Sequence, residues 1–78
     1  MNLVYLTKIA PEQNQQRYYS LQVVRGLFGD WGLIREWGRI GLSGRTRTDW
    51  FTNRVDATAA GGKLAMQKGK RGYHEVGR

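Results

Sequence analysis

Two neighbouring segments with the period of a β-strand, joined by a glycine-containing turn, constrain the fold of this chain most. In residues 17–25 the odd positions from 19 to 23 are Tyr, Leu and Val, whereas the even positions between them are more polar. Alternate side chains of a strand share one face of a sheet. Residues 26–30, Gly-Leu-Phe-Gly-Asp, supply turn residues, and residues 31–40 follow as the next strand. The sequence therefore predicts a β-hairpin over residues 17–40.

Two further strands are predicted on either side of this hairpin. Residues 4–9 have strand composition, and Pro11 with the polar run after it breaks the pattern. Residues 45–52 are rich in threonine and aromatic side chains and follow a turn with two glycines at residues 40–44. Residues 73–76 are predicted to form a short final strand or an ordered tail.

One helix is predicted over residues 57–68, where alanine and leucine recur at helical spacing, with Asn53 and Asp56 as candidate caps. Gly61 and Gly62 disfavour it by about 1 kcal/mol per glycine relative to alanine. Packing must therefore hold this helix, and the glycines allow close approach to the sheet. We expect an α+β fold in one domain spanning residues 1–78, with an antiparallel, mostly meander sheet of about four strands and the helix on its apolar face.

The net charge of the chain limits the classes of partner that it is expected to bind. Thirteen Lys and Arg residues stand against six Asp and Glu residues, which gives a formal net charge of +7. Such an excess favours nucleic acid, then an anionic membrane or an acidic protein. The chain has no cysteine, which excludes disulfides, thiol catalysis and zinc–thiolate sites. The sequence lacks a signal peptide and a run of ~20 apolar residues, so we expect a cytoplasmic protein that does not associate with a membrane.

The arginines concentrate around the tripeptide Trp37-Gly38-Arg39. In an extended strand, Arg35, Trp37 and Arg39 project from the same face. Guanidinium groups suit phosphate oxygens, and an indole offers a surface on which a nucleotide can stack.

A turn at residues 40–44 brings a second pair, Arg45 and Arg47, beside the strand that carries Trp37. Arg54 follows shortly afterwards, and a further basic group consists of Lys63, Lys68, Lys70 and Arg71. Two simpler interpretations remain open at this point. Trp37 can be a core residue, and the arginines can form a solvated strand face.

Evidence for catalysis is poor. His74 is the only histidine, and the six carboxylates are scattered along the chain without the spacing of an acid–base pair or a metal site. Neither serine has a base nearby in the sequence or the context of a nucleophile elbow. We therefore expect no enzyme activity, no cofactor and no metal.

The chain resembles the WGR domain family, which is named for its Trp-Gly-Arg tripeptide. The resemblance rests on residues 18–24 (Tyr-Tyr-Ser-Leu-Gln-Val-Val), residues 31–41 around the tripeptide, and the Gly72–Tyr73 pair near the end. The family comprises accessory modules of DNA-dependent poly(ADP-ribose) polymerases, parts of bacterial proteins similar to the molybdate metabolism regulator, and stand-alone small bacterial proteins. Many members have an asparagine just before the aromatic pair, where this chain has Gln16 and Arg17.

What the resemblance implies is binding to DNA ends. In the polymerases the motif tryptophan packs on the sugar of a terminal nucleotide, and the motif arginine contacts DNA or neighbouring protein domains. By resemblance these roles fall on Trp37 and Arg39, with Gly38 allowing close backbone approach. The polymerases' ADP-ribosylating domain is absent, so no transferase activity is implied.

We therefore expect a nucleic-acid-binding accessory module, with duplex DNA ends or breaks as its target and DNA favoured over RNA. The alternative is a protein-interaction module that uses the same tryptophan and arginine surface, since these residue types also dominate protein interfaces. The predicted nucleic-acid-binding residues are Trp37, Gly38, Arg39, Arg35, Arg45 and Arg47.

Overall fold

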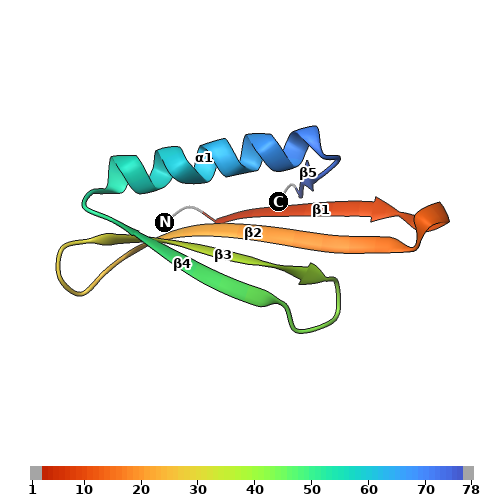
Figure 1. The fold of residues 1–78 in the computed structure, drawn as a ribbon, viewed down its shortest axis with the longest axis horizontal. Coiled ribbons are helices and arrows are strands. Elements are labelled where there is room, and N and C mark those ends of the chain that lie inside the picture. Colours follow the sequence, from red (N-terminus) through yellow and green to blue (C-terminus); the bar gives the residue numbers. More distant parts are fainter. Residues whose placement is uncertain (1–2, 77–78) are drawn as a thin grey trace.

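The computed structural model describes residues 3–76, which form an antiparallel five-stranded sheet with one helix on one of its faces (Figure 1). The spatial order of the strands is β4-β3-β2-β1-β5. The predicted α+β class is therefore confirmed, and the tail supplies the fifth, two-residue strand. In chain order the elements are β1 Leu3–Ala10, the 3-10 turn η1 Pro11–Gln13, β2 Gln15–Arg25, β3 Trp31–Arg39, β4 Arg45–Phe51, α1 Arg54–Lys70 and β5 His74–Glu75.

The predicted hairpin is formed by β2 and β3. The backbone N–H of Gly26 donates to the carbonyl of Asp30 at 2.8 Å and closes the turn. The pairing then runs without interruption from Arg25 opposite Trp31 to Arg17 opposite Arg39. Because no bulge shifts the register, all odd-numbered residues of β2 and β3 lie on the same face.

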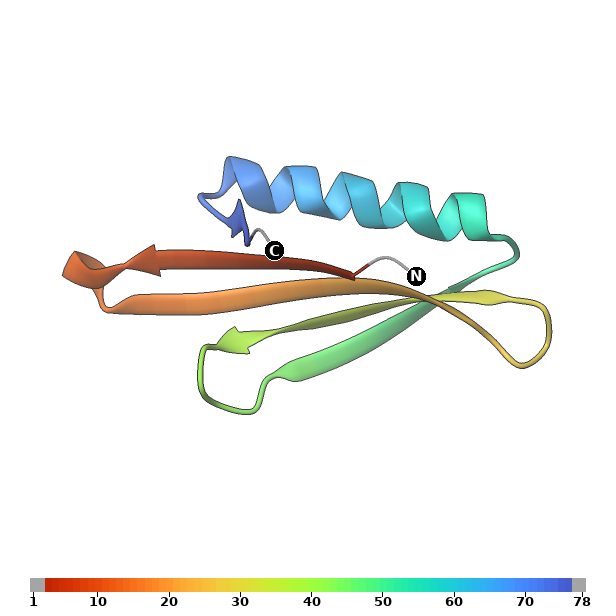
Figure 2. The ribbon, with the colours of Figure 1, turned by 180° about the vertical axis from the view of Figure 1, so that it is seen from behind.

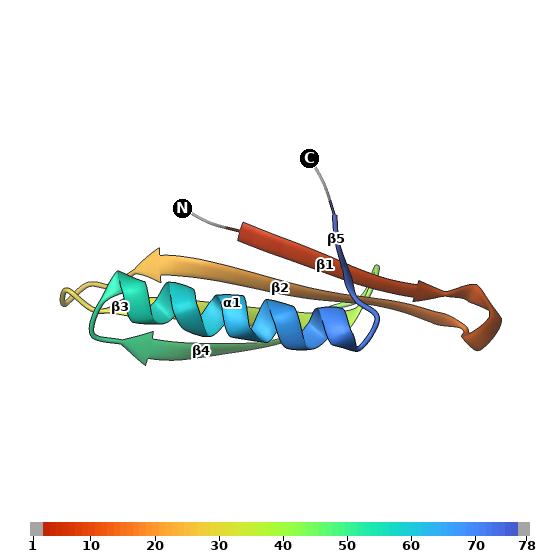
Figure 3. The ribbon, with the colours of Figure 1, turned by 90° about the horizontal axis from the view of Figure 1, so that it is seen from above.

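The core lies between this face and the helix. Leu6, Tyr19, Leu21 and Leu33 form the buried cluster, and Leu33 is only 1% exposed. Figure 3 shows α1 lying along the central strands of the sheet. Within residues 3–76 no helix lies on the other face of the sheet, which we call the open face. Figure 2 shows that the β1–β2 hairpin extends past the C-terminal end of α1, so the helix covers only part of the face on which it lies.

The helix begins three residues earlier than predicted. Asn53 is its N-cap, and the side-chain oxygen of Asn53 accepts a hydrogen bond from the backbone N–H of Asp56 at 2.8 Å. Of the two predicted caps, Asn53 therefore acts as the cap, and Asp56 lies in the first turn. The helix also continues through Gly69 to Lys70, before the chain reverses at Gly72 with a positive φ of 96°.

Small residues allow α1 to lie close to the sheet. Ala57 and Gly61 are buried, and a Cβ atom at Gly61 would lie 3.2 Å from the Cδ1 atom of Leu33. Gly62 is exposed, and nothing lies within 4 Å of where its Cβ would be. Close approach to the sheet therefore requires a small side chain at Gly61 and places no such demand on Gly62.

Candidate functional site

The lysine and arginine side chains of the strands lie on the same face of the sheet as α1, and we call this face the basic face. The register pairs Lys8 with Arg17, Arg17 with Arg39, and Arg35 with Arg47. Trp37 lies opposite Arg45. Since directly paired residues project from the same side of a sheet, the register joins these side chains into one face. The described strand residues that carry a cation on the basic face are Lys8, Arg17, Arg25, Arg35, Arg39, Arg45 and Arg47.

Trp37 is half-buried at the margin of the core. Its indole stacks on the ring of Tyr19, with 6.0 Å between the ring centroids and 28° between the ring planes. It also packs against the buried cluster that contains Leu33. The sequence left open whether Trp37 is a core residue or an exposed platform. Because Trp37 lies where the core ends, part of its indole packs on the core and part remains accessible.

A hollow of about 260 Å³ opens beside this indole, between the helix and the strands. It is lined by Tyr19, Arg35, Trp37, Arg47 and Lys68. Two aromatic rings and three cations thus border one small space, which we call the Trp37 hollow. This combination suits a ligand that is both anionic and able to stack.

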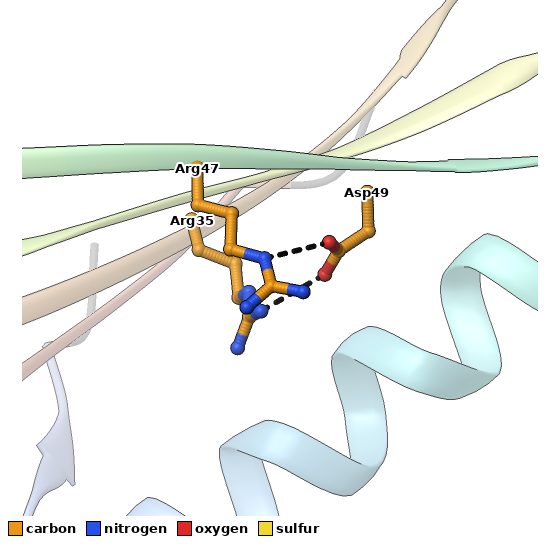
Figure 4. A network of polar contacts seen from close by, with 3 residues as sticks. All are labelled: Arg35, Arg47 and Asp49. Carbon is orange, nitrogen blue, oxygen red and sulfur yellow. Dashed lines mark hydrogen bonds and ion pairs between the residues drawn. The ribbon is translucent and has the colours of Figure 1, made fainter.

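One carboxylate holds two of the three cations in place. Arg35 Nη2 lies 3.0 Å from Asp49 Oδ2, and Arg47 Nε lies 2.9 Å from Asp49 Oδ1 (Figure 4). The side chain of Arg35 is largely buried, and its Nε has no hydrogen-bond partner. Two guanidinium groups sharing one carboxylate leave an excess positive charge at the hollow.

Lys68 supplies the third cation from the helix. Its Nζ lies 4.5 Å from the centroid of the Tyr19 ring and 5.7 Å from that of Tyr73. Burial lowers the pKa of Lys68 below its usual value, and the positive charges of Arg71, Arg17 and Arg35 lower it further. No carboxylate in residues 3–76 forms an ion pair with Lys68. Besides burial, the lowered pKa of Lys68 thus reflects the positive potential of the neighbouring cations, which an anion in the hollow would relieve.

Arg39 and Arg45 lie outside the hollow. Arg39 donates through Nη1 to the carbonyl oxygen of Asn14 and through Nη2 to Oδ1 of the same residue, both at 3.3 Å. Asn14 has a positive φ of 54° in the turn between β1 and β2. The motif arginine thus connects β3 to that turn. Arg45 is exposed at the start of β4, opposite Trp37.

Gly38 has a reason within the fold for lacking a side chain. A Cβ atom at Gly38 would lie 2.9 Å from the Cα atom of Gly44, on the other side of the β3–β4 turn. The close backbone approach at Gly38 is therefore one between two parts of this chain.

Sequence reasoning did not include Tyr19 or Lys68, two of the residues that line the Trp37 hollow, in the site. The inward side of α1 runs from Ala57 through Gly61 and Leu64, and Lys68 continues this spacing. That spacing was a signal by which the sequence could have placed Lys68 against the sheet.

Arg54 was grouped with the other arginines on sequence proximity. Its guanidinium instead lies 5.7 Å from the centroid of the Trp31 ring, with Arg25 at 6.0 Å from the same ring. Trp31 and Trp37 stand at opposite ends of β3, so Arg54 does not contribute to the Trp37 hollow.

Comparison with known proteins identifies the family. The model of the WGR domain matches residues 2–78, and the chain therefore belongs to the WGR domain family, as its sequence motifs indicated. The uncharacterised protein y4dW of Sinorhizobium fredii is 40% identical over 70 residues. The match covers 90% of this chain and 34% of y4dW, so the chain spans about a third of that relative.

A crystal structure of a protein from Bacteroides fragilis has a similar fold. Its TM-score is 0.77 at 29% sequence identity, and the match covers 96% of this chain and 19% of the Bacteroides protein. In both relatives the matching region is thus one part of a longer polypeptide. Within residues 3–76, α1 is too short and too polar to cross a lipid bilayer.

Proposed function

We propose that this WGR domain binds the ends of duplex DNA. Trp37 would offer its accessible side to the terminal nucleotide, and the cations around the Trp37 hollow would contact the phosphate backbone. Arg45, exposed beside the indole, would contribute a further phosphate contact.

The observation that carries the proposal is the uncompensated positive charge beside a half-buried indole. Asp49 is the only carboxylate that pairs with Arg35 and Arg47, and Lys68 has no acidic partner among the described residues. A solvated strand face would not need to bring three cations and two rings around one space. Because the hollow lies at the margin of the core, it is open to a flat group entering from solvent.

Fluorescence anisotropy with a labelled short blunt duplex tests the proposal. The wild type should prefer the open duplex to a closed circle of the same sequence composition. Trp37→Leu, which keeps apolar packing, should weaken end binding by about 1–3 kcal/mol, because stacking of an aromatic residue contributes that amount per base. Its salt dependence should remain close to that of the wild type, because no phosphate contact is removed.

Arg45→Ala should change the salt dependence of binding, which Trp37→Leu leaves close to that of the wild type. Each lost phosphate contact reduces the slope of log K against log salt by about 1, so binding should become less sensitive to salt. Arg25→Ala is the matched control, because Arg25 is an exposed strand arginine at the other end of the basic face. It should change end binding less than Arg45→Ala does. Melting temperatures of all variants establish that they are folded.

Equal affinity for closed circles and open ends would contradict end recognition and leave general duplex binding. A duplex RNA of the same length distinguishes DNA from RNA. Absence of binding to any nucleic acid at low salt would instead favour a protein-interaction module that uses the same surface.

A further inference from the structure

The turn at residues 40–44 determines where Arg45 lies relative to the motif tryptophan. Arg45 directly follows this turn and pairs with Trp37. Residues 41–43 are exposed, and Gly41 has a positive φ of 91°. Gly44 is instead half-buried. The turn is therefore in contact with the rest of the domain at the residue just before Arg45.

Tyr18 reaches this turn from β2, on the open face. It pairs with Gly38 of β3, and a Cβ atom at Gly38 would lie 3.5 Å from Cε1 of the Tyr18 ring. Because Gly38 has no side chain, the ring extends over β3, and its hydroxyl oxygen lies against Gly44. The carbonyl oxygen of Trp37 also lies against Gly44, and a Cβ atom there would overlap both oxygens. The backbone at Gly44 thus fits a narrow space between Tyr18 and β3.

The Tyr18 side chain is itself held in place. It is only 8% exposed, and the ring of Tyr5 stacks on it with 5.8 Å between the centroids and 14° between the planes. Its hydroxyl donates a hydrogen bond to Oε2 of Glu36 at 3.0 Å. Burial raises the pKa of Tyr18, and the bond to Glu36 raises it further, so the hydroxyl keeps its proton and donates at neutral pH. Tyr18 is therefore a rigid support for the turn.

The position of Arg45 depends on its backbone. In residues 3–76 no carboxylate forms an ion pair with the Arg45 side chain, so the contacts at Gly44 set where its guanidinium group can reach. A binding group acts well only where its supports hold it within about 0.5 Å of the productive geometry. A contact made on the open face thus affects the basic face through the turn.

We propose that Tyr18 is a positioning residue for DNA binding. Its hydroxyl, held by Glu36, fixes the backbone at Gly44 and thereby places Arg45 beside Trp37. Tyr18 lies on the open face and does not touch the DNA. The inference rests on the function proposed above, because it concerns the phosphate contact assigned there to Arg45.

Tyr18→Phe tests the proposal, because it removes the hydroxyl and keeps the buried ring. Anisotropy with the blunt duplex should show end binding weakened about three- to tenfold, which lies within the range for residues that act through one another. The slope of log K against log salt should fall by up to about 1, the value of one phosphate contact. Tyr5→Phe is the matched control, because it removes a hydroxyl from the stacked ring on β1, which β2 separates from β3. It should change neither quantity.

The double variant Tyr18→Phe with Arg45→Ala distinguishes positioning from a general loss of structure. Once Arg45 is absent, the loss of the Tyr18 hydroxyl should change neither the affinity nor the slope any further. An effect of Tyr18→Phe that persists undiminished without Arg45 would overturn the proposal, as would wild-type affinity and slope in Tyr18→Phe alone. Melting temperatures verify that each variant is folded.

Backbone amide relaxation, measured by NMR on the free protein, separates this inference from the proposed function. The amides of Gly44 and Arg45 should become more mobile in Tyr18→Phe and remain unchanged in Tyr5→Phe. Unchanged relaxation in Tyr18→Phe would overturn the support of the turn, whatever the DNA measurements give. A wild type that binds no DNA would instead overturn the proposed function and, with it, the role of Tyr18 in binding.

Discussion

Lys68 stands at a position of α1 where an apolar side chain would continue the inward stripe. Ala57, Gly61 and Leu64 precede it on that side of the helix. The lysine instead extends over the Tyr19 ring, where its stem packs and its ammonium group meets other cations. A charged group is held there at a cost to stability, which is typical of a residue kept for binding.

Lys68→Met should therefore increase the free energy of unfolding at neutral pH and weaken DNA binding at the same time. Because the pKa of Lys68 is lowered in the folded state, the unfolded chain binds the proton more tightly. Wild-type stability should then rise with pH between the lowered pKa and the usual value of 10.5. Below this window the cost of the charged lysine is constant.

Urea denaturation of both proteins across this alkaline range measures the difference. The gap between variant and wild type should shrink as the pH rises. Lys70→Met is the control, because Lys70 is exposed at the same end of α1, and it should leave the pH dependence unchanged. A constant gap at all pH values would mean that the charge of Lys68 carries no cost.

At the scale of the element, α1 is held by packing more than by the preference of its sequence for a helix. Its interior contains Gly61, Gly62 and Gly69, each of which favours the unfolded chain. The Asn53 cap and the contact with the sheet offset this tendency. Gly61 faces the sheet and Gly62 faces solvent, so substitutions at these two positions separate the contribution of packing to stability from that of helix preference.

Gly62→Ala should stabilise the domain by about 0.5–1 kcal/mol, because alanine is the better helix former and the added Cβ meets nothing within 4 Å. Gly61→Ala gains the same preference, but its Cβ would lie 3.2 Å from Leu33 Cδ1 and would push the helix or the leucine aside. Its effect should be smaller than that of Gly62→Ala, or destabilising. Chemical denaturation of the two variants measures the order, and a larger gain for Gly61→Ala would contradict the packing described here.

At the scale of the whole molecule, we expect the distribution of charge over the two faces of the sheet to determine binding more than the net charge does. The strand lysines and arginines in residues 3–76 all project from the face on which α1 lies, whereas the open face presents mainly aromatic, aliphatic, hydroxyl and amide groups with the carboxylate of Glu36. The molecule is therefore basic on one side and nearly uncharged on the other. Interactions of different chemistry can be made on the two sides of one thin sheet.

A pair of substitutions that preserves the net charge tests whether the distribution of charge over the two faces governs DNA binding. Thr48→Lys adds a cation to the open face, since Thr48 pairs with Ile34, and Arg45→Gln removes one from the basic face. The double variant keeps the formal charge of +7, but it should bind a DNA duplex as weakly as Arg45→Gln alone. Anisotropy at nanomolar protein, where self-association is negligible, measures the affinities. Recovery of wild-type affinity would show that only net charge governs binding.

The β2–β3 hairpin and the α+β class were predictable because they depend on local patterns. Alternating side chains and turn residues specify strands, their faces and their neighbours. The same parity argument placed Arg35 and Trp37 on one face and brought Arg45 and Arg47 beside them. These relations follow from the period of a strand and the length of a turn.

The position of the helix was decided by the tertiary structure, because it depends on packing between residues distant in sequence. Only that packing brings Lys68 to Tyr19 and leaves Trp37 half-buried beside a hollow. The bond from Arg39 to Asn14 and the place of Arg54 over Trp31 likewise depend on which elements meet in space. The sequence by itself determined the elements and the faces of the strands, whereas the docking of α1 on one face decided which cations meet the indole and which side of the sheet stays open.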